Sequence, residues 1–138
     1  MLSFELKTIQ SCVEFPGTIL KVTVKDKSYA FALQVIALCR DLTARNEFVL
    51  SKQLLKSGTS IGANVAEASA GQSKADFIAK MAIASKEARE TEYWLSLLRD
   101  SKLVESQQVE PLLLEAREIS KMLTSIVKTA QENHKTRS

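Results

Sequence analysis

The sequence has few of the side chains on which most enzyme sites depend. It has one histidine, two cysteines and 6% aromatic residues, and it lacks a glycine-rich phosphate loop. His134 falls in a stretch that we expect to fray, so a Ser-His-Asp triad or a Cys-His pair has no base held in a core. Glu87 and Glu90 echo a carboxylate pair of dimetal bundles, but the histidines of such sites are missing, and neighbouring bases suit them better as partners. We therefore expect no enzymatic activity, no metal and no cofactor.

Long apolar runs are also missing. No apolar stretch approaches the roughly 18 residues that a membrane span needs. Residues 1–25 lack the basic start and apolar block of a secretory signal. The sequence therefore predicts a cytoplasmic protein without membrane association, in which Cys12 and Cys39 are two reduced thiols.

Blocks of one charge are absent as well. The chain carries 19 Lys and Arg residues against 16 Asp and Glu residues, and the two signs are spread almost evenly along its length. The net charge of +3 therefore forms no basic patch in the sequence, and the electrostatic signal for nucleic acid is weak. Only folding or assembly can concentrate the basic charge on one surface.

The sequence is rich in Ala, Leu, Lys and Glu and has only four glycines and two prolines, which favours helices. Two stretches keep an unbroken three-four apolar spacing, and such seams must pack against other helices. The first seam consists of Phe77, Met81, Ala84, Ala88, Thr91, Leu95 and Leu98. The second consists of Val109, Leu112, Ala116, Ile119, Leu123, Ile126 and Ala130. One domain of 138 residues can bury the core that these seams require.

Residues 1–25 differ from the rest, because Thr, Val and Ile dominate residues 18–24 and Pro16-Gly17 is a turn signal. They form either a short hairpin or an irregular arm. Asp26 can then cap a first helix that runs to about Ala44. Its buried stripe is expected to contain Phe31, Val35, Leu38 and Leu42, with Ala32, Ile36 and Cys39 beside them.

Three further helices follow. Ser51 can cap the second, which stops at Gly71, and Ser73 with Asp76 resembles a capping box for the third. Ser106 can cap the fourth, or Pro111 can sit at its first helical position and leave a separate turn before it. It ends near Glu132, which leaves residues 133–138 as a polar tail. Short links favour antiparallel neighbours, so we predict an all-α, up-down-up-down four-helix bundle over residues 26–132.

The second helix carries an unusual inner face. Its apolar seam of Leu54, Gly58, Ile61, Val65 and Ala68 includes an interior glycine, and Gly62 adds another. Each glycine costs about 1 kcal/mol relative to Ala unless another backbone approaches closely or the axis bends.

Beside that seam runs a polar stripe of Ser57, Ser60, Asn64 and Glu67. It either caps and solvates the helix, or Asn64 and Glu67 make buried hydrogen bonds to another helix or subunit.

The third helix shows a second line about a third of a turn from its seam. This line consists of Ile83, Glu87, Glu90, Trp94 and Leu97. One core cannot cover both lines, so the economical explanation is an interface between subunits. The alternative is a wide stripe that serves a three-sided core position.

Four runs make the pattern familiar: SKQLLKSGTSIGAN at 51–64, VAEA at 65–68, GQSKADF at 71–77 and KEARETEYWL at 86–95. Over about residues 22–130 the chain resembles bacterial four-helix bundle proteins related to those encoded in intervening sequences of large-subunit ribosomal RNA genes. That resemblance implies an antiparallel bundle that assembles into a ring, typically a pentamer, without known catalysis. A close branch of the family serves diversity-generating retroelements as a reverse-transcriptase accessory protein, and its basic rings bind nucleic acid.

The leading expectation is therefore a non-enzymatic homo-oligomer with a nucleic-acid-related accessory role. RNA or DNA and a reverse transcriptase are the partners that the resemblance implies. Candidate phosphate contacts are Arg40, Lys52, Lys56, Lys74 and Lys80, which ring symmetry would repeat. A solvated face is the other reading of Lys52 and Lys56. The alternative function is a scaffold that docks a protein partner without binding nucleic acid.

Overall fold

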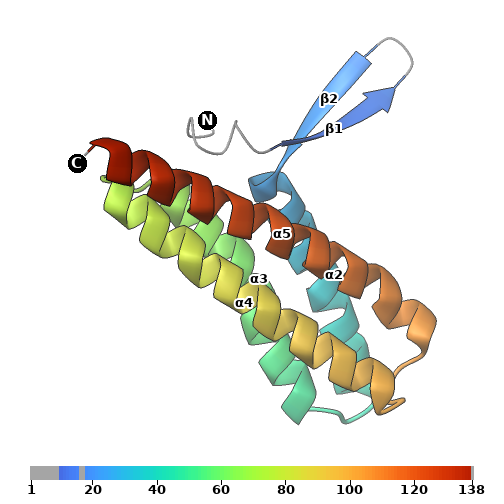
Figure 1. The fold of residues 1–138 in the computed structure, drawn as a ribbon. Coiled ribbons are helices and arrows are strands. Elements are labelled where there is room, and N and C mark those ends of the chain that lie inside the picture. The colour runs from blue at the N-terminus through green and yellow to red at the C-terminus, as the bar shows by residue number, and fades with distance from the viewer. Residues whose placement is uncertain (1–9, 16–17, 138) are drawn as a thin grey trace.

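Four helices form an antiparallel bundle (Figure 1). They are α2 (Val24–Ala44), α3 (Val49–Ser69), α4 (Lys74–Asp100) and α5 (Ser106–Arg137). Each helix packs against the next one in the chain, and α5 closes the bundle against α2. The computed structural model describes residues 10–15 and 18–137, and the side chains of residues 22–136. The predicted all-α, up-down-up-down arrangement is confirmed.

A hairpin precedes the bundle. Strands β1 (Gln10–Phe15) and β2 (Thr18–Thr23) pair antiparallel, with Gln10 opposite Thr23 and Phe15 opposite Thr18. Over residues 10–15 and 18–23, the structure thus supports a hairpin and not an irregular arm. The Pro16-Gly17 turn signal lies outside the described residues.

The chain passes directly from β2 into α2 through a capping box. The Thr23 hydroxyl accepts a hydrogen bond from the Asp26 backbone N–H at 3.1 Å, and the Asp26 carboxylate accepts one from the Thr23 N–H at 3.4 Å. Asp26 is therefore not the cap that the sequence predicted but the third residue of the helix. Thr23 takes the capping position because it ends the strand in an extended conformation, from which its hydroxyl reaches the free N–H groups.

The predicted Ser51 cap of α3 is also wrong. The helix starts at Val49 after Phe48, whose side chain makes no capping hydrogen bond. Ser51 lies inside the helix, where its hydroxyl donates to the carbonyl of Cys39 at 3.1 Å and so joins α3 to α2. The Glu47 carboxylate accepts from the Leu50 N–H at 3.3 Å, so an acidic side chain satisfies the first turn instead.

The two remaining helices begin with polar side chains at their first turns. Ser73 caps α4 as predicted, because its hydroxyl accepts from the Asp76 N–H at 3.1 Å. Helix α5 starts at Ser106, so Pro111 lies within it and not at its first position. The helix continues to Arg137, beyond the predicted end near Glu132, and in this last turn the Thr136 hydroxyl donates to the Glu132 carbonyl at 2.7 Å.

Both three-four seams lie in the core. Every residue of the α4 and α5 seams is buried, and so are all five residues of the α3 seam. On α2 the predicted stripe is buried with Cys39, but Ile36 is 38% exposed and Ala32 is half-buried. Ile36 was expected beside the buried stripe, but it lines a surface groove with Tyr29 and Leu33.

The interior glycines of α3 allow a close approach to α2. A Cβ atom at Gly58 would lie 2.8 Å from Val35 Cγ1, and one at Gly62 would lie 3.3 Å from the Ser28 carbonyl oxygen. Close helix packing thus accounts for both glycines and offsets their conformational cost.

Candidate oligomer and nucleic-acid surfaces

The second line of α4 lies on the outer side of the helix. We call Ile83, Glu87, Glu90, Trp94 and Leu97 the α4 line. Ile83 is 41% exposed and Leu97 is 37% exposed, whereas Trp94 is half-buried against the core. Trp94 Nε1 donates to the Glu90 carboxylate at 3.4 Å, which holds the indole along the helix. The core of one chain therefore leaves the line partly uncovered, and a contact between subunits stays a prediction.

The polar stripe of α3 changes from buried to exposed along its length. Ser57 is buried and accepts a hydrogen bond from the Thr91 hydroxyl of α4 at 3.0 Å. Ser60 and Asn64 are half-buried, and Asn64 Nδ2 donates to the Ser60 carbonyl at 2.8 Å within the same helix. The stripe thus makes one buried side-chain bond between helices, at Ser57, where no such bond was predicted.

Glu67 does not fit the expectation of a buried, hydrogen-bonded carboxylate. Its side chain is 60% exposed, and it forms an ion pair with Lys80 of α4, whose Nζ lies 3.7 Å from Glu67 Oε1. The stripe turns outward here because Glu67 lies near the end of α3 and further round from the seam than Ser57 does. Burial of Asn64 or Glu67 by a second copy of the chain stays a prediction.

The stripe and the α4 line belong to one surface along the contact between α3 and α4. The Thr91–Ser57 hydrogen bond and the Lys80–Glu67 ion pair both cross that contact. Ile83 and Glu87 follow Lys80 by three and seven residues, so they lie on the same side of α4. The α3–α4 surface therefore mixes apolar side chains with carboxylates.

A second apolar surface lies on the outside of α2 and α3. Tyr29 is 69% exposed, Leu33 is 54% exposed, and both line a groove with Ile36. Small residues of α3, including Gly62, Ala63 and Ala66, form its other wall. We call this surface the α2–α3 groove. The sequence carried a signal for it, since Tyr29, Leu33, Ile36 and Arg40 repeat the four-three spacing beside the core stripe.

The five candidate phosphate contacts fall into two separate groups. Arg40, Lys52 and Lys56 are exposed near the link between α2 and α3. Lys74 and Lys80 are half-buried near the start of α4, and Lys80 faces Glu67. Lys52 precedes Glu67 by 15 residues, which separates the groups by about 22 Å along α3. One chain therefore does not gather these five cations into a single site.

Several other ionisable groups serve the fold. Lys27 of α2 pairs with Glu115 of α5 at 2.7 Å and with Glu118 at 3.2 Å. Burial opposes its charge, but the hydrogen bonds and attraction of the two carboxylates prevail and raise the pKa of Lys27. Burial also raises the pKa of the Cys39 thiol, despite a hydrogen bond to Ser51 that acts in the opposite direction.

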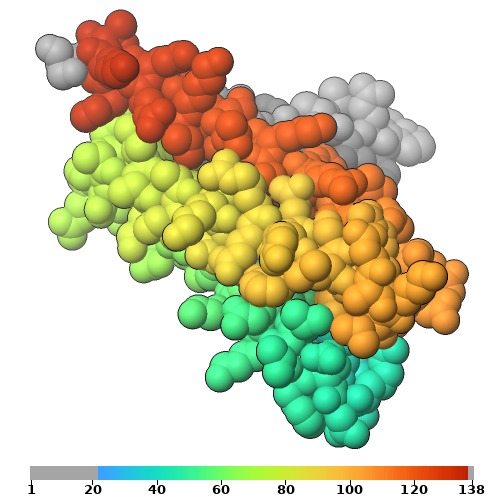
Figure 2. All heavy atoms as spheres, turned by 60° about the horizontal axis from the view of Figure 1, so that its bottom comes forward, coloured from blue at the N-terminus to red at the C-terminus, as the bar shows by residue number. Residues whose placement is uncertain are grey.

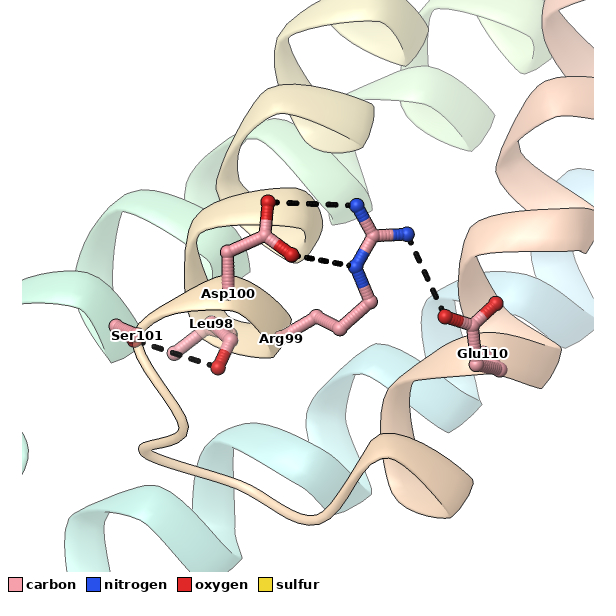
Figure 3. Close-up of polar contacts among 5 residues, drawn as sticks. All are labelled: Leu98, Arg99, Asp100, Ser101 and Glu110. Atoms are coloured by element: carbon pink, nitrogen blue, oxygen red, sulfur yellow. Dashed lines mark hydrogen bonds and ion pairs between the residues drawn. The ribbon is translucent and has the colours of Figure 1, made fainter.

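Figure 3 shows the ion pairs at the turn from α4 to α5. Arg99 Nε lies 2.8 Å from Asp100 Oδ1, and Arg99 Nη1 lies 3.4 Å from Glu110 Oε1 of α5. The hydrogen bonds to Asp100 raise the pKa of Arg99, and the guanidinium lowers the pKa of Asp100. At this end of α4 and α5 the cation is therefore neutralised within the chain.

Comparison with known proteins places the chain in a family. A model of the family described as 23S rRNA-intervening sequence protein matches residues 20–125. The chain belongs to this family. It is also similar to the crystal structure of a protein of unknown function from the S23 ribosomal protein family of Bacteroides thetaiotaomicron VPI-5482. The two chains are 52% identical, the match covers 76% of this chain and 98% of that one, and the TM-score is 0.74. No curated protein matches the chain.

The family match confirms the resemblance found in the sequence. Its description and that of the solved structure name no enzymatic activity. In the part of the chain that the structure describes, no group of three His, Cys, Asp or Glu side chains could hold a metal ion. No helix among the described residues is long and apolar enough to span a bilayer.

Proposed function

We propose that this chain is a cytoplasmic, non-enzymatic homo-oligomer, with a pentameric ring as the best single arrangement, and that it has an accessory role connected with nucleic acid. One observation carries the assembly: the chain leaves two different apolar surfaces uncovered, the α4 line and the α2–α3 groove. Exposed apolar surface of this kind marks sites of protein contact.

Two different surfaces favour a ring over a two-fold dimer. A two-fold contact uses the same patch on both subunits, whereas a head-to-tail contact joins two distinct patches and gives a ring when the rotation between neighbours closes. The α4 line of one copy fits this scheme as the helix that enters the α2–α3 groove of the next copy. The number five comes from the family resemblance.

Charge supports the same pairing. The α4 line carries Glu87 and Glu90, and the apolar row of the groove ends at Arg40. Within the described part of the chain, neither Glu87 nor Arg40 has an ion-pair partner. A carboxylate on one copy and a guanidinium on the next can therefore pair and fix the register of the contact.

The nucleic-acid half of the proposal is supported by the family, whose description refers to an intervening sequence of 23S rRNA. The net charge of +3 is small for one chain, but a ring repeats each exposed cation and adds their fields. A reverse transcriptase is the protein partner that the resemblance contributes to the proposal.

The assembly is tested by light scattering on two single variants and a control. Five copies of the 15.3 kDa chain give about 77 kDa for the native protein. We expect Leu33→Glu, in the groove, and Leu97→Glu, on the α4 line, each to yield folded monomers. Leu114→Glu is the control, because Leu114 is 61% exposed on α5 and belongs to neither surface.

Mixing the two interface variants separates a ring from a dimer. Each retains the surface that the other has lost, so the mixture should form a heterodimer through one intact contact. Monomers in the mixture, with each variant folded, would contradict the pairing of these two surfaces. A monomeric native protein at micromolar concentration would contradict the assembly itself.

The role in nucleic-acid binding is tested by filter binding of RNA, DNA and hybrid duplexes over a series of salt concentrations. Phosphate contacts predict affinity that falls steeply with salt and depends little on sequence. If no affinity below about 100 μM is found at low salt, the oligomer is better explained as a scaffold for a protein partner.

A further inference from the structure

The outer contact between α4 and α5 contains a second set of basic residues, none of which is among the five sequence candidates. Three cations of α5, Arg117, Lys121 and Lys128, line a surface groove with Glu92 of α4 as the only carboxylate among its lining residues. Figure 2 shows α4 in yellow and α5 in orange to red running side by side across this face.

The contacts across the groove fix which side chains face it. Arg117 Nε lies 3.8 Å from Glu92 Oε1, and the Ser85 hydroxyl lies 3.5 Å from that of Thr124. On α4, Arg89 lies one turn after Ser85 and almost one turn before Glu92, so it lies on the same side of the helix.

The groove residues of α5 also lie on one side of their helix. Lys121 lies one turn after Arg117, and Lys128 lies one turn after Thr124. These four positions share one side of the helix, and the cations among them follow the length of the groove.

Two of these cations are free to bind a ligand. Lys121 and Lys128 are exposed, and no acidic side chain among the described residues pairs with either of them. Arg89 is likewise exposed and without an ion-pair partner there. The single ion pair of the groove is long, and the Arg117 side chain remains 46% exposed. This contrasts with Arg99, whose guanidinium is shared by two carboxylates at the end of the same helix pair.

We propose that the α4–α5 groove binds a chain of phosphate groups, as in the backbone of a nucleic-acid strand. This inference rests on the proposed nucleic-acid role and assigns its site to residues outside the five sequence candidates. Arg117 and Lys128 are about 17 Å apart along α5, too far for one phosphate to contact both. Neutral donors lie between the cations, since Ser120 and Ser125 also line the groove, and hydroxyls are common phosphate ligands.

The test compares two matched pairs of lysine variants for binding of a short single-stranded RNA of mixed sequence. The groove variant is Lys121→Gln with Lys128→Gln. The rival variant is Lys52→Gln with Lys56→Gln, which removes two exposed charges from the sequence candidates on α3. The slope of log affinity against log salt should become shallower by about 1.4 for each bound groove that loses two phosphate contacts. If the groove is the site, the rival variant should keep the native slope, and both variants should keep the native mass and helicity.

The possible results separate this site from the function on which it rests. Loss of affinity in the rival variant alone would overturn the groove and leave the nucleic-acid role in place. Equal binding by the native protein and the groove variant would also overturn the groove. If the native protein binds no RNA, inorganic tripolyphosphate is titrated while the backbone amide signals of Ser120 and Ser125 are followed by NMR. Shifts of these two signals would support a phosphate groove without a nucleic-acid role. Unchanged signals would overturn the phosphate groove as well as the nucleic-acid role.

Discussion

Substituting Gly58 by alanine tests how closely α3 approaches α2. The new methyl group would lie 2.8 and 2.9 Å from the two γ-methyl carbons of Val35, which is fully buried. Valine in a helix has essentially one rotamer, so Val35 cannot turn away. Overpacking of this kind costs about 1 to 3 kcal/mol. The higher helix propensity of alanine offsets about 1 kcal/mol of this cost. We therefore expect Gly58→Ala to lower the free energy of unfolding by about 1 kcal/mol.

The effect of Gly58→Ala on the free energy of unfolding should change sign when Val35 is truncated. In a Val35→Ala background the clashing methyl groups are gone, so Gly58→Ala should stabilise the protein by about 1 kcal/mol through helix propensity. Urea unfolding followed by circular dichroism, at one protomer concentration for all variants, measures both effects. The difference in stability between Gln53→Ala and Gln53→Gly, at an exposed position of α3 outside both apolar surfaces, is the control that measures propensity in this helix. Stabilisation by Gly58→Ala in the native background would refute the close approach.

Three further predictions concern single side chains. Glu67→Ala should change the stability of a dissociated monomer by less than about 0.5 kcal/mol, because its ion pair with Lys80 is exposed; a loss of about 1 to 3 kcal/mol in the oligomer alone would show that a second copy buries it. The folded-state pKa of Lys27 lies above its ordinary value of 10.5, so its ion pairs stabilise the fold below pH 10.5 and that contribution is lost as the pH rises through the folded value; the stability difference between the native protein and Lys27→Met should therefore shrink in alkaline urea titrations, and a constant difference would contradict it. In a Cys12→Ser background, the buried Cys39 thiol should react with a disulfide reagent only as fast as the protein opens, and rapid labelling of the folded protein would contradict its burial.

The bundle could be predicted from the sequence because apolar spacing reports burial directly. A side chain that recurs every three or four residues must lie on one side of a helix, and the α4 and α5 seams are buried without exception. Helix starts were harder to predict. Thr23 and Asp26 can both cap α2, and the extended backbone at the end of β2 decides in favour of Thr23. Ser51 can cap a helix too, but its hydroxyl donates to the Cys39 carbonyl instead.

The surfaces could be predicted only in part, because a surface depends on which helices lie side by side. The α4 line was visible within one helix. The α2–α3 groove needs Tyr29 and Leu33 of one helix together with Ala63 and Ala66 of the next. The spacing that places Arg117, Lys121 and Lys128 on one side of a helix was present in the sequence. Whether these cations stay unpaired depends on which carboxylates of α4 lie opposite them. Even charge along a chain is therefore compatible with uneven charge on the folded protein.

The two proposals use different sides of the bundle, and this separation matters for their mechanism. The α4 line lies on the outer side of α4 next to α3, because Ile83 and Glu87 share a side of the helix with Lys80, which pairs with Glu67 of α3. The contacts of Ser85 and Glu92 instead reach α5. A subunit contact through the α4 line and the α2–α3 groove would therefore leave the α4–α5 groove open on every copy. Each subunit would then present one basic groove, and one nucleic-acid strand could engage several in turn. Avidity would multiply a weak single contact, so a dissociating variant such as Leu97→Glu should lose most RNA affinity although its groove residues are unchanged. Full affinity in that monomer would show that a single groove is sufficient and that the ring has another purpose.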